Sequence, residues 1–277
     1  MTAGAERAAA VASRPLTPSG IAARRFHFCR LVLCRGALLG AAGLGLSACG
    51  GGVPLFHSAH VIQPGDTRFG AGVSGQVALA KLPPSPAPNG AAEDATFQAV
   101  TVSPQVAPWV GGRIGIAGDN EAGLSYSGRT IRVDGRHAFS LGGPALSVGL
   151  GASALVGVPV GTAGSSSGLY GGGLDVPVLL GFRSTSDLYA IWFGPRAGVE
   201  LLSGAFATSS SLEAPTPISA RHVYAGITAG FKVGFRHVHV AFELNGSYHR
   251  SDGLFGGRAL GQNQFTLTPG GALLFSF

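Results

Sequence analysis

The feature that most constrains this chain is an alternation of apolar with small or polar residues, which begins near Arg68 and recurs to the C-terminus. The clearest example is the segment 238–245, VHVAFELN, whose even-numbered residues are Val or other apolar types, whereas His239, Glu243 and Asn245 alternate with them. Successive side chains of a β-strand point to opposite faces. A strand of this kind therefore has one face suited to an apolar surrounding and one suited to polar groups.

The alternation recurs in ten segments, separated by clusters of turn-forming residues. The predicted strands cover residues 68–80, 106–117, 121–127, 130–139, 145–156, 172–183, 188–201, 222–235, 238–248 and 264–277. From Gly118 onward every second connection is short, as in outer-membrane barrels with short periplasmic turns and longer extracellular loops. The sequence thus predicts an all-β fold over residues 67–277: a single antiparallel up-and-down transmembrane β-barrel of about ten strands, with loops 81–105, 202–221 and 249–263 outside.

Composition favours a membrane barrel over the alternatives. Only 12% of residues are charged and 45% are hydrophobic, whereas a soluble globular domain has about 25% charged residues. A soluble β-sandwich or lipocalin-like barrel also alternates, but its solvent face should be rich in Lys and Glu rather than in Gly, Ala and Ser. A helical membrane protein would need apolar runs of about 20 residues, which the mature chain lacks.

The N-terminal region resembles the leader of a bacterial lipoprotein. Arginines precede an apolar run over 36–46, and the segment Leu46-Ser47-Ala48-Cys49 is similar to a lipobox. The resemblance implies that the leader 1–48 is cleaved as a signal peptide, that Cys49 is lipidated and that residues 49–66 form a flexible tether. Because no Asp follows Cys49, it also implies passage by the lipoprotein-sorting machinery to the outer membrane, with the lipid anchor in the periplasmic leaflet.

The formal net charge of +6 does not indicate nucleic-acid binding. The leader holds six arginines and one glutamate, whereas residues 49–277 hold 13 basic and 12 acidic side chains. A nearly neutral mature chain lacks the basic footprint that phosphate binding requires. Two of the three cysteines fall inside the leader, so no internal disulfide is expected in the mature protein.

If the apolar face points outward, charged side chains line the lumen. The predicted lumen-facing residues are Arg113, Arg132, Asp134, Arg136, Asp175, Arg196, Glu200, Lys232 and Glu243. A ten-stranded barrel is only modestly wider than an eight-stranded one, whose interior side chains fill. We therefore expect arginines and carboxylates to pair and to plug the lumen. Inward glycines and serines keep open the alternative of a narrow channel or a binding site for small polar or anionic solutes.

Catalytic and metal chemistry are weakly indicated. The histidines at 222, 237, 239 and 249 scatter over different predicted strand levels, whereas zinc needs three or four converging ligands. No metal site and no cofactor are expected. His249 with Asp252 and the serines 209–211 are the only candidates for an outer-membrane hydrolase, the second alternative. Because no Asp–His pair lies at matching strand tips, we do not expect an enzyme.

The last strand supports the same architecture. Leu273, Phe275 and Phe277 share one face at the C-terminus, which resembles the signal that the barrel-assembly machinery reads in outer-membrane barrels. Segments 60–74, 111–127 and 129–139 and the last strand resemble an outer-membrane β-barrel family of Gram-negative bacteria with a lipoprotein-type signal peptide. Gly135-Arg136 departs from the Ala-Lys often found there. The resemblance implies fold and location and no reaction, so a structural or passive envelope role is expected, with outer-membrane lipid as the surrounding partner.

Overall fold

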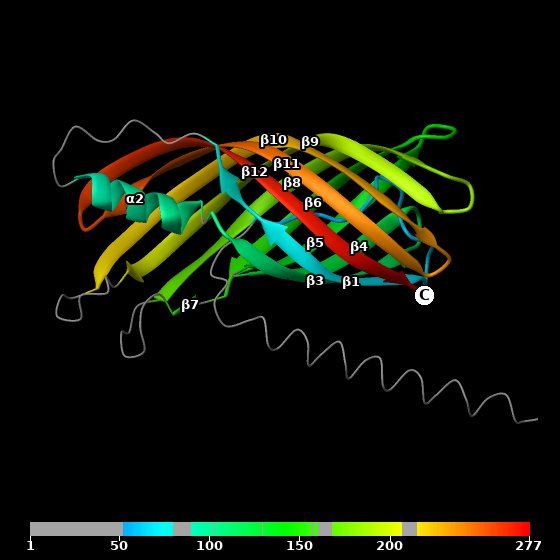
Figure 1. The fold of residues 1–277 in the computed structure, drawn as a ribbon, viewed down its shortest axis with the longest axis horizontal. Helices are drawn as coiled ribbons and strands as arrows, with labels where there is room; N and C mark the ends of the chain where they lie inside the picture. The colour runs from blue at the N-terminus through cyan, green and yellow to red at the C-terminus, as the bar shows by residue number, and fades with distance from the viewer. Residues whose placement is uncertain are drawn as a thin grey trace, which may run out of the picture. The chain divides into compact units, whose positions relative to one another are not determined.

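The computed structural model describes residues 52–79, 90–102, 104–128, 130–156, 158–159, 168–206 and 215–277. In this part of the chain, ten long strands form one closed antiparallel barrel (Figure 1). They are β1 (Thr67–Gly75), β3 (Val106–Ile116), β4 (Asn120–Ser127), β5 (Thr130–Ser140), β6 (Ala145–Leu155), β8 (Gly168–Arg183), β9 (Tyr189–Phe206), β10 (Thr216–Phe235), β11 (Val238–Phe255) and β12 (Arg258–Ser276). The predicted fold class is confirmed.

The barrel closes between its first and last strands. β1 pairs with β12 from Arg68↔Ser276 to Ser74↔Gly270, and its other edge pairs with β3. Two short strands extend this frame: β2 (Val77–Ala78) continues along β12, and β7 (Val158–Pro159) pairs with β8. Because β1 has a partner on each edge, the described barrel has no open seam at this point.

The strands from β8 to β12 extend well beyond their predicted ends. The predicted loop 249–263 is wrong, since β11 and β12 run through it and meet at Gly256 and Gly257, whose φ angles are +59° and +82°. The predicted loop 202–221 is strand at both of its described ends, over residues 202–206 and 216–221. Both misses have one cause: in this part of β10 and β11 the outward positions include polar residues such as Arg221 and Asp252, so the apolar alternation fades while the hydrogen-bonded ladder continues.

A helix lies within the predicted loop 81–105. Helix α2 (Gly90–Thr101) sits at the end of the barrel away from the C-terminus (Figure 1). Its Phe97 and Val100 are buried in a cluster with apolar side chains of strands β8 to β12, namely Leu169, Leu202, Ile218, Ala220, Phe255 and Leu260. Arg258 of β12 pairs with Glu93 at 2.7 Å. The helix therefore covers the mouth of the barrel at this end, opposite the C-terminus, which we call the outer mouth.

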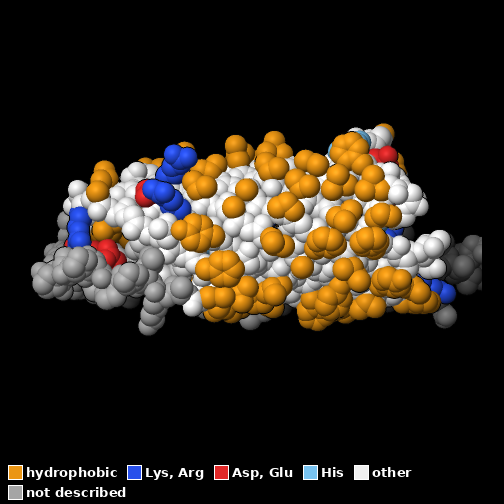
Figure 2. All heavy atoms as spheres, turned by 90° about the horizontal axis from the view of Figure 1, so that it is seen from above, with side chains coloured by type: hydrophobic (Ala, Val, Ile, Leu, Met, Phe, Trp, Pro, Cys, Tyr) orange, Lys and Arg blue, Asp and Glu red, His pale blue; other side chains and the backbone are white. Residues whose placement is uncertain are grey.

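The apolar faces of the strands point outward. In β10, Phe231, Val233 and Phe235 are 46%, 51% and 65% exposed, whereas Lys232 between them is 2% exposed. Figure 2 shows hydrophobic side chains spread over the outer surface, with few charges among them. A soluble barrel would have the opposite orientation, so the outside of this barrel suits hydrocarbon. No described helix is long and apolar enough to cross a bilayer.

Candidate functional site

The lumen is occupied by the chain's own segment 52–62, which we call the plug. The sequence placed residues 49–66 in a flexible tether, but Leu55, Phe56 and Ala59 are at most 3% exposed and share a buried cluster with tryptophans of the wall. The plug runs from Gly52, whose carbonyl accepts hydrogen bonds at the outer ends of β1 and β4, towards the start of β1 at the opposite end. Cys49 and the leader lie outside the described residues, so their processing stays a prediction.

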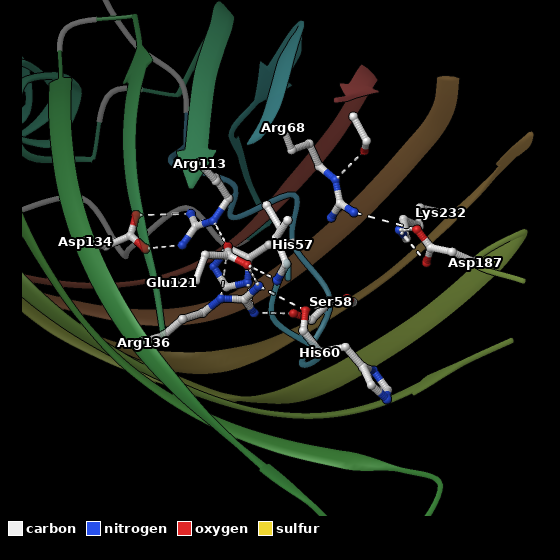
Figure 3. Close-up of polar contacts among 12 residues, drawn as sticks. His57, Ser58, His60, Arg68, Arg113, Glu121, Asp134, Arg136, Asp187 and Lys232 are labelled. Atoms are coloured by element: carbon white, nitrogen blue, oxygen red, sulfur yellow. Dashed lines mark hydrogen bonds and ion pairs between the residues drawn. The ribbon is translucent and has the colours of Figure 1, made fainter. Parts of the chain in front are cut away.

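Charged side chains of the wall bind the backbone of the plug. The Glu243 carboxylate accepts hydrogen bonds from the backbone N–H groups of Leu55 and Phe56, at 2.6 and 2.8 Å. Glu121 accepts one from Ile62 N–H at 2.9 Å. Arg136 donates to the Ser58 carbonyl and contacts His57 Nδ1 at 2.9 Å (Figure 3).

Arg196 also donates a hydrogen bond to the plug, to the Val53 carbonyl at 2.5 Å. Buried backbone groups need partners. The plug forms no strand or helix, and the ionic side chains of the wall supply those partners instead.

Aromatic packing holds the same segment. The Phe56 ring meets the Trp109 ring edge-on, with centroids 4.7 Å apart. Trp192 donates from Nε1 to Glu243 at 3.3 Å, so both tryptophans of the chain contact the plug or its anchor. Inward glycines make the space: a Cβ on Gly230 would lie 2.4 Å from Trp192, and a Cβ on Gly270 would lie 2.7 Å from Phe56. These small residues thus accommodate aromatic rings.

An unbroken chain of buried ion pairs fills one side of the lumen. It links, in order, Arg136, Glu121, Arg113, Asp134, Arg132, Asp175 and Arg196. Every side chain in it is 10% exposed or less. A buried pair adds little net stability, because desolvation offsets the attraction, but removing one partner leaves a costly unpaired charge. These ion pairs therefore specify the shape of the interior more than they stabilise the fold.

A second group of charged side chains lies at the end of the barrel opposite α2, around Asp187 in the turn between β8 and β9. Lys232 donates to both Asp187 carboxylate oxygens, at 2.8 and 2.9 Å, and Arg68 lies 3.7 Å away (Figure 3). Burial alone would raise the pKa of the Asp187 carboxyl. The hydrogen bonds and charge of Lys232, together with the charge of Arg68, outweigh this effect, so the pKa lies below its ordinary value. This turn therefore neutralises Lys232 at the end of the lumen.

A third group forms a small polar chamber between the plug and α2. Glu200 contacts His222 Nδ1 at 3.1 Å, His222 Nε2 contacts His249 Nδ1 at 2.7 Å, and His249 Nε2 contacts Thr266 Oγ1 at 2.8 Å. The chamber volume is about 60 Å³, and Gly52, Thr101, Arg196 and Tyr224 are among its lining residues. This is space for a few water molecules.

Sequence reasoning separated the two chamber histidines, although they stack with ring centroids 4.9 Å apart. The strand register brings them together, since Tyr224 pairs with His249 and His222 therefore lies diagonally beside it. A predicted register would have been needed to find this contact. Among the described residues no group of three or more His, Cys, Asp or Glu could hold a metal ion.

The predicted site residues fall into three groups. Seven of the nine lumen residues are buried in the interior, whereas Arg113, in the ion-pair chain, and Glu200, at the chamber, are half-buried. Leu273, Phe275 and Phe277 are exposed on the outer surface. Of the hydrolase candidates, His249 points inward whereas Asp252 is 55% exposed on the outer face, so the pair does not meet. Serines 209–211 lie outside the described residues.

Comparisons with known proteins give distant likenesses only. No family model and no curated protein matches the chain. Among solved structures, the Neisserial surface protein A is 9% identical, covering 76% of this chain and 96% of its own with a TM-score of 0.31. The Pseudomonas putida toluene transporter TodX is 9% identical, with coverage of 84% and 97% and a TM-score of 0.26. The Acinetobacter baumannii outer-membrane channel DcaP is 8% identical, with coverage of 77% and 96% and a TM-score of 0.16. The architecture therefore rests on the strand pairing and burial of this chain itself.

Proposed function

We propose that this protein is an outer-membrane β-barrel, closed from within, that has a structural or passive role in the envelope and catalyses no reaction. The apolar outer surface and the pairing of β1 with β12 support insertion as a closed barrel. The observation that carries the closed state is the binding of the plug backbone by Glu243, Glu121 and Arg136.

The competing function is a narrow channel for small polar or anionic solutes. A solute would have to pass α2, the chamber of about 60 Å³ and the plug in turn. Each of these steps breaks hydrogen bonds or apolar contacts that the described residues make. A channel therefore requires displacement of the plug, and this separates the two functions experimentally.

The test is the conductance of the refolded full-length protein in planar lipid bilayers. We expect no discrete openings from the native chain. We expect openings from Glu243→Ala, because the Leu55 and Phe56 N–H groups lose their acceptor and the plug is released part of the time. Asp252→Asn, on the outer surface, is the matched control and should stay silent. Equal openings from the native chain and both variants would reject the closed barrel.

The lipid anchor on Cys49 is a separate proposal, and the plug constrains it. Gly52 lies at the outer ends of β1 and β4, where Ser74 and Ser127 donate to its carbonyl at 2.6 and 2.7 Å. Three residues reach about 10 Å at most, much less than the thickness of the hydrocarbon core of about 30 Å. With the plug docked, we therefore propose that a lipid on Cys49 stays near the outer rim rather than in the periplasmic leaflet.

Metabolic labelling with radioactive palmitate tests the modification itself, with Cys49→Ser as the unlabelled control. Surface accessibility of an epitope inserted just after Cys49 tests the side. Labelling of Cys49 together with an epitope that is reachable only after the outer membrane is permeabilised would contradict the outer-rim placement.

A further inference from the structure

Two arginines interrupt the apolar outer surface of the barrel at one place. Arg221 of β10 and Arg250 of β11 both point outward and are exposed. The register pairs Arg221 with Asp252 and Val223 with Arg250, so the arginines are diagonal neighbours across the two strands. Such positions lie about 7–8 Å apart. Figure 2 shows basic and acidic side chains gathered on the outer surface, with hydrophobic side chains around them.

The two arginines stand at the edge of the apolar band. Two residues before Arg250, Tyr248 is 52% exposed and pairs with Phe265, which is 41% exposed. Outward aromatic side chains mark the boundary between hydrocarbon and headgroups in membrane barrels. The arginines lie one row beyond this aromatic pair, on the side of the outer mouth. They are therefore at the level of lipid headgroups.

An open groove of about 520 Å³ is lined by Arg221 and by Asp252, the ion-pair partner of Arg250. Its walls also include Tyr170, Leu201 and Leu254, which are 63%, 60% and 51% exposed. Large apolar side chains at headgroup level would otherwise face water or polar groups. A groove with apolar walls and a charged side matches a molecule that is part apolar and part ionic.

The charged side chains beside the groove, Arg221, Arg250 and Asp252, form a patch whose net charge determines the charge of the ligand it favours. Arg250 pairs with Asp252 at 2.9 Å, whereas Arg221 forms no ion pair within the described part of the chain. The patch therefore carries one more positive than negative side chain. Guanidinium groups bind phosphate in a bidentate geometry, and two of them within reach of one phosphate favour it further.

We propose that this groove binds the phosphorylated headgroup of an anionic lipid in the outer leaflet. Arg221 and Arg250 hold the phosphate, and the walls formed by Tyr170, Leu201 and Leu254 hold the part of the lipid next to it. The inference rests on the proposed function only in that the barrel must be inserted in a bilayer. It is independent of whether the lumen is open.

The test measures lipid retention by the full-length protein with native mass spectrometry. The refolded protein is presented with equal amounts of dioleoyl phosphatidic acid and dioleoyl phosphatidylcholine. We expect the native chain to retain phosphatidic acid preferentially. The preference should fall about fivefold for each arginine replaced, in Arg221→Gln and Arg250→Gln. Arg236→Gln is the matched control, because Arg236 is also exposed but lies at the turn on the opposite rim, over the Phe235 ring.

Four outcomes would overturn the proposal. Equal retention of the two lipids by the native chain would overturn it. So would an undiminished preference for phosphatidic acid in the double variant that combines Arg221→Gln with Arg250→Gln. Displacement by an equal concentration of inorganic phosphate would identify a site for the free ion instead. If the double variant loses self-association rather than lipid, the groove is a contact between two copies. Heat-modifiable migration of each variant separates these results from a failure of the barrel to fold and insert.

Discussion

At the scale of single residues, the interior is specified by a few side chains that the alternation pattern treats as equivalent. Inward glycines and inward tryptophans both occupy lumen positions, yet each needs the other, as Gly230 and Trp192 show. Phe56 is the residue of the plug whose contacts are most aromatic, and it is 1% exposed. The plug and the wall are therefore packed as one core.

Replacing Phe56 tests whether the plug is docked. Phe56→Ala removes the ring beside Trp109 and should lower stability by about 3–5 kcal/mol, the usual cost for a buried Phe. Because both tryptophans contact the plug or its anchor, the emission should shift to longer wavelength and acrylamide quenching should increase. Phe69→Ala is the control, since Phe69 is 54% exposed on the outer surface. Identical emission from the two variants would mean that the plug is not docked.

Two glycines offer a matched pair for the packing of the lumen. A Cβ on Gly230 would lie 2.4 Å from the Trp192 ring, whereas a Cβ on Gly246 would lie 3.5 Å from Phe265, an ordinary contact. Gly230→Ala should therefore cost about 1–3 kcal/mol through overpacking, and Gly246→Ala should be neutral. Urea unfolding in detergent micelles measures both. A stable Gly230→Ala variant would contradict the packing of Trp192 against this strand.

The turn at Asp187 gives a pH dependence with a definite sign. The folded-state pKa of Asp187 is lowered by Lys232 and Arg68, so its contribution is present above the ordinary pKa of about 4 and is lost as the pH falls through the lower folded value. Asp187→Asn should destabilise the protein at pH 7, because Lys232 loses its counterion. The difference between the native chain and the variant should shrink at the lowest pH values at which unfolding can be measured. A constant difference across that range would argue against the ion pair.

At the scale of elements, the sequence located every long strand, because a buried ionic face and a lipid-facing apolar face impose the alternation directly. It missed the elements that are not part of that two-sided wall. The apolar residues of the plug, such as Leu55, Phe56 and Ile62, follow neither a strand nor a helix periodicity, so the sequence alone indicates a linker. Helix α2 follows a proline-rich stretch and buries mainly Phe97 and Val100, too few apolar positions to produce a helical pattern. The contact of His222 with His249 depends on register across strands, which a single sequence does not specify.

Helix α2 is attached to the barrel more weakly than the strands are to one another. Its apolar contacts centre on Phe97, which is fully buried, and its ion pair between Glu93 and Arg258 is about 40% exposed. Exposed pairs of this kind add little. Phe97→Ala should therefore increase hydrogen exchange throughout residues 90–101 while β10 and β11 stay protected. Glu93→Gln is the control and should change exchange only slightly. Unchanged exchange in Phe97→Ala would show that the helix is held by other contacts.

At the scale of the whole molecule, the continuous ladder is the property that resists denaturation. Each long strand has a hydrogen-bonded partner on both edges, including the pair β1 and β12. We expect the unheated protein to migrate differently from the boiled protein in dodecyl sulfate gels, because a closed barrel keeps its shape in the detergent. Gly72→Leu should abolish the shift, since even a Cβ there would meet the Gly271 carbonyl oxygen at 2.1 Å. A single band for the native chain at all temperatures would contradict a closed barrel.

The course of residues 52–62 also sets an order of events during biogenesis. A segment that the wall of its own chain surrounds cannot enter the lumen laterally once the first and last strands have paired. Either the wall forms around it, or it is drawn in lengthwise through a mouth that α2 has not yet covered. In both cases residues 52–62 must be in place before the molecule matures, so a bulky domain inserted just ahead of Gly52 should delay maturation far more than the same domain fused after Phe277.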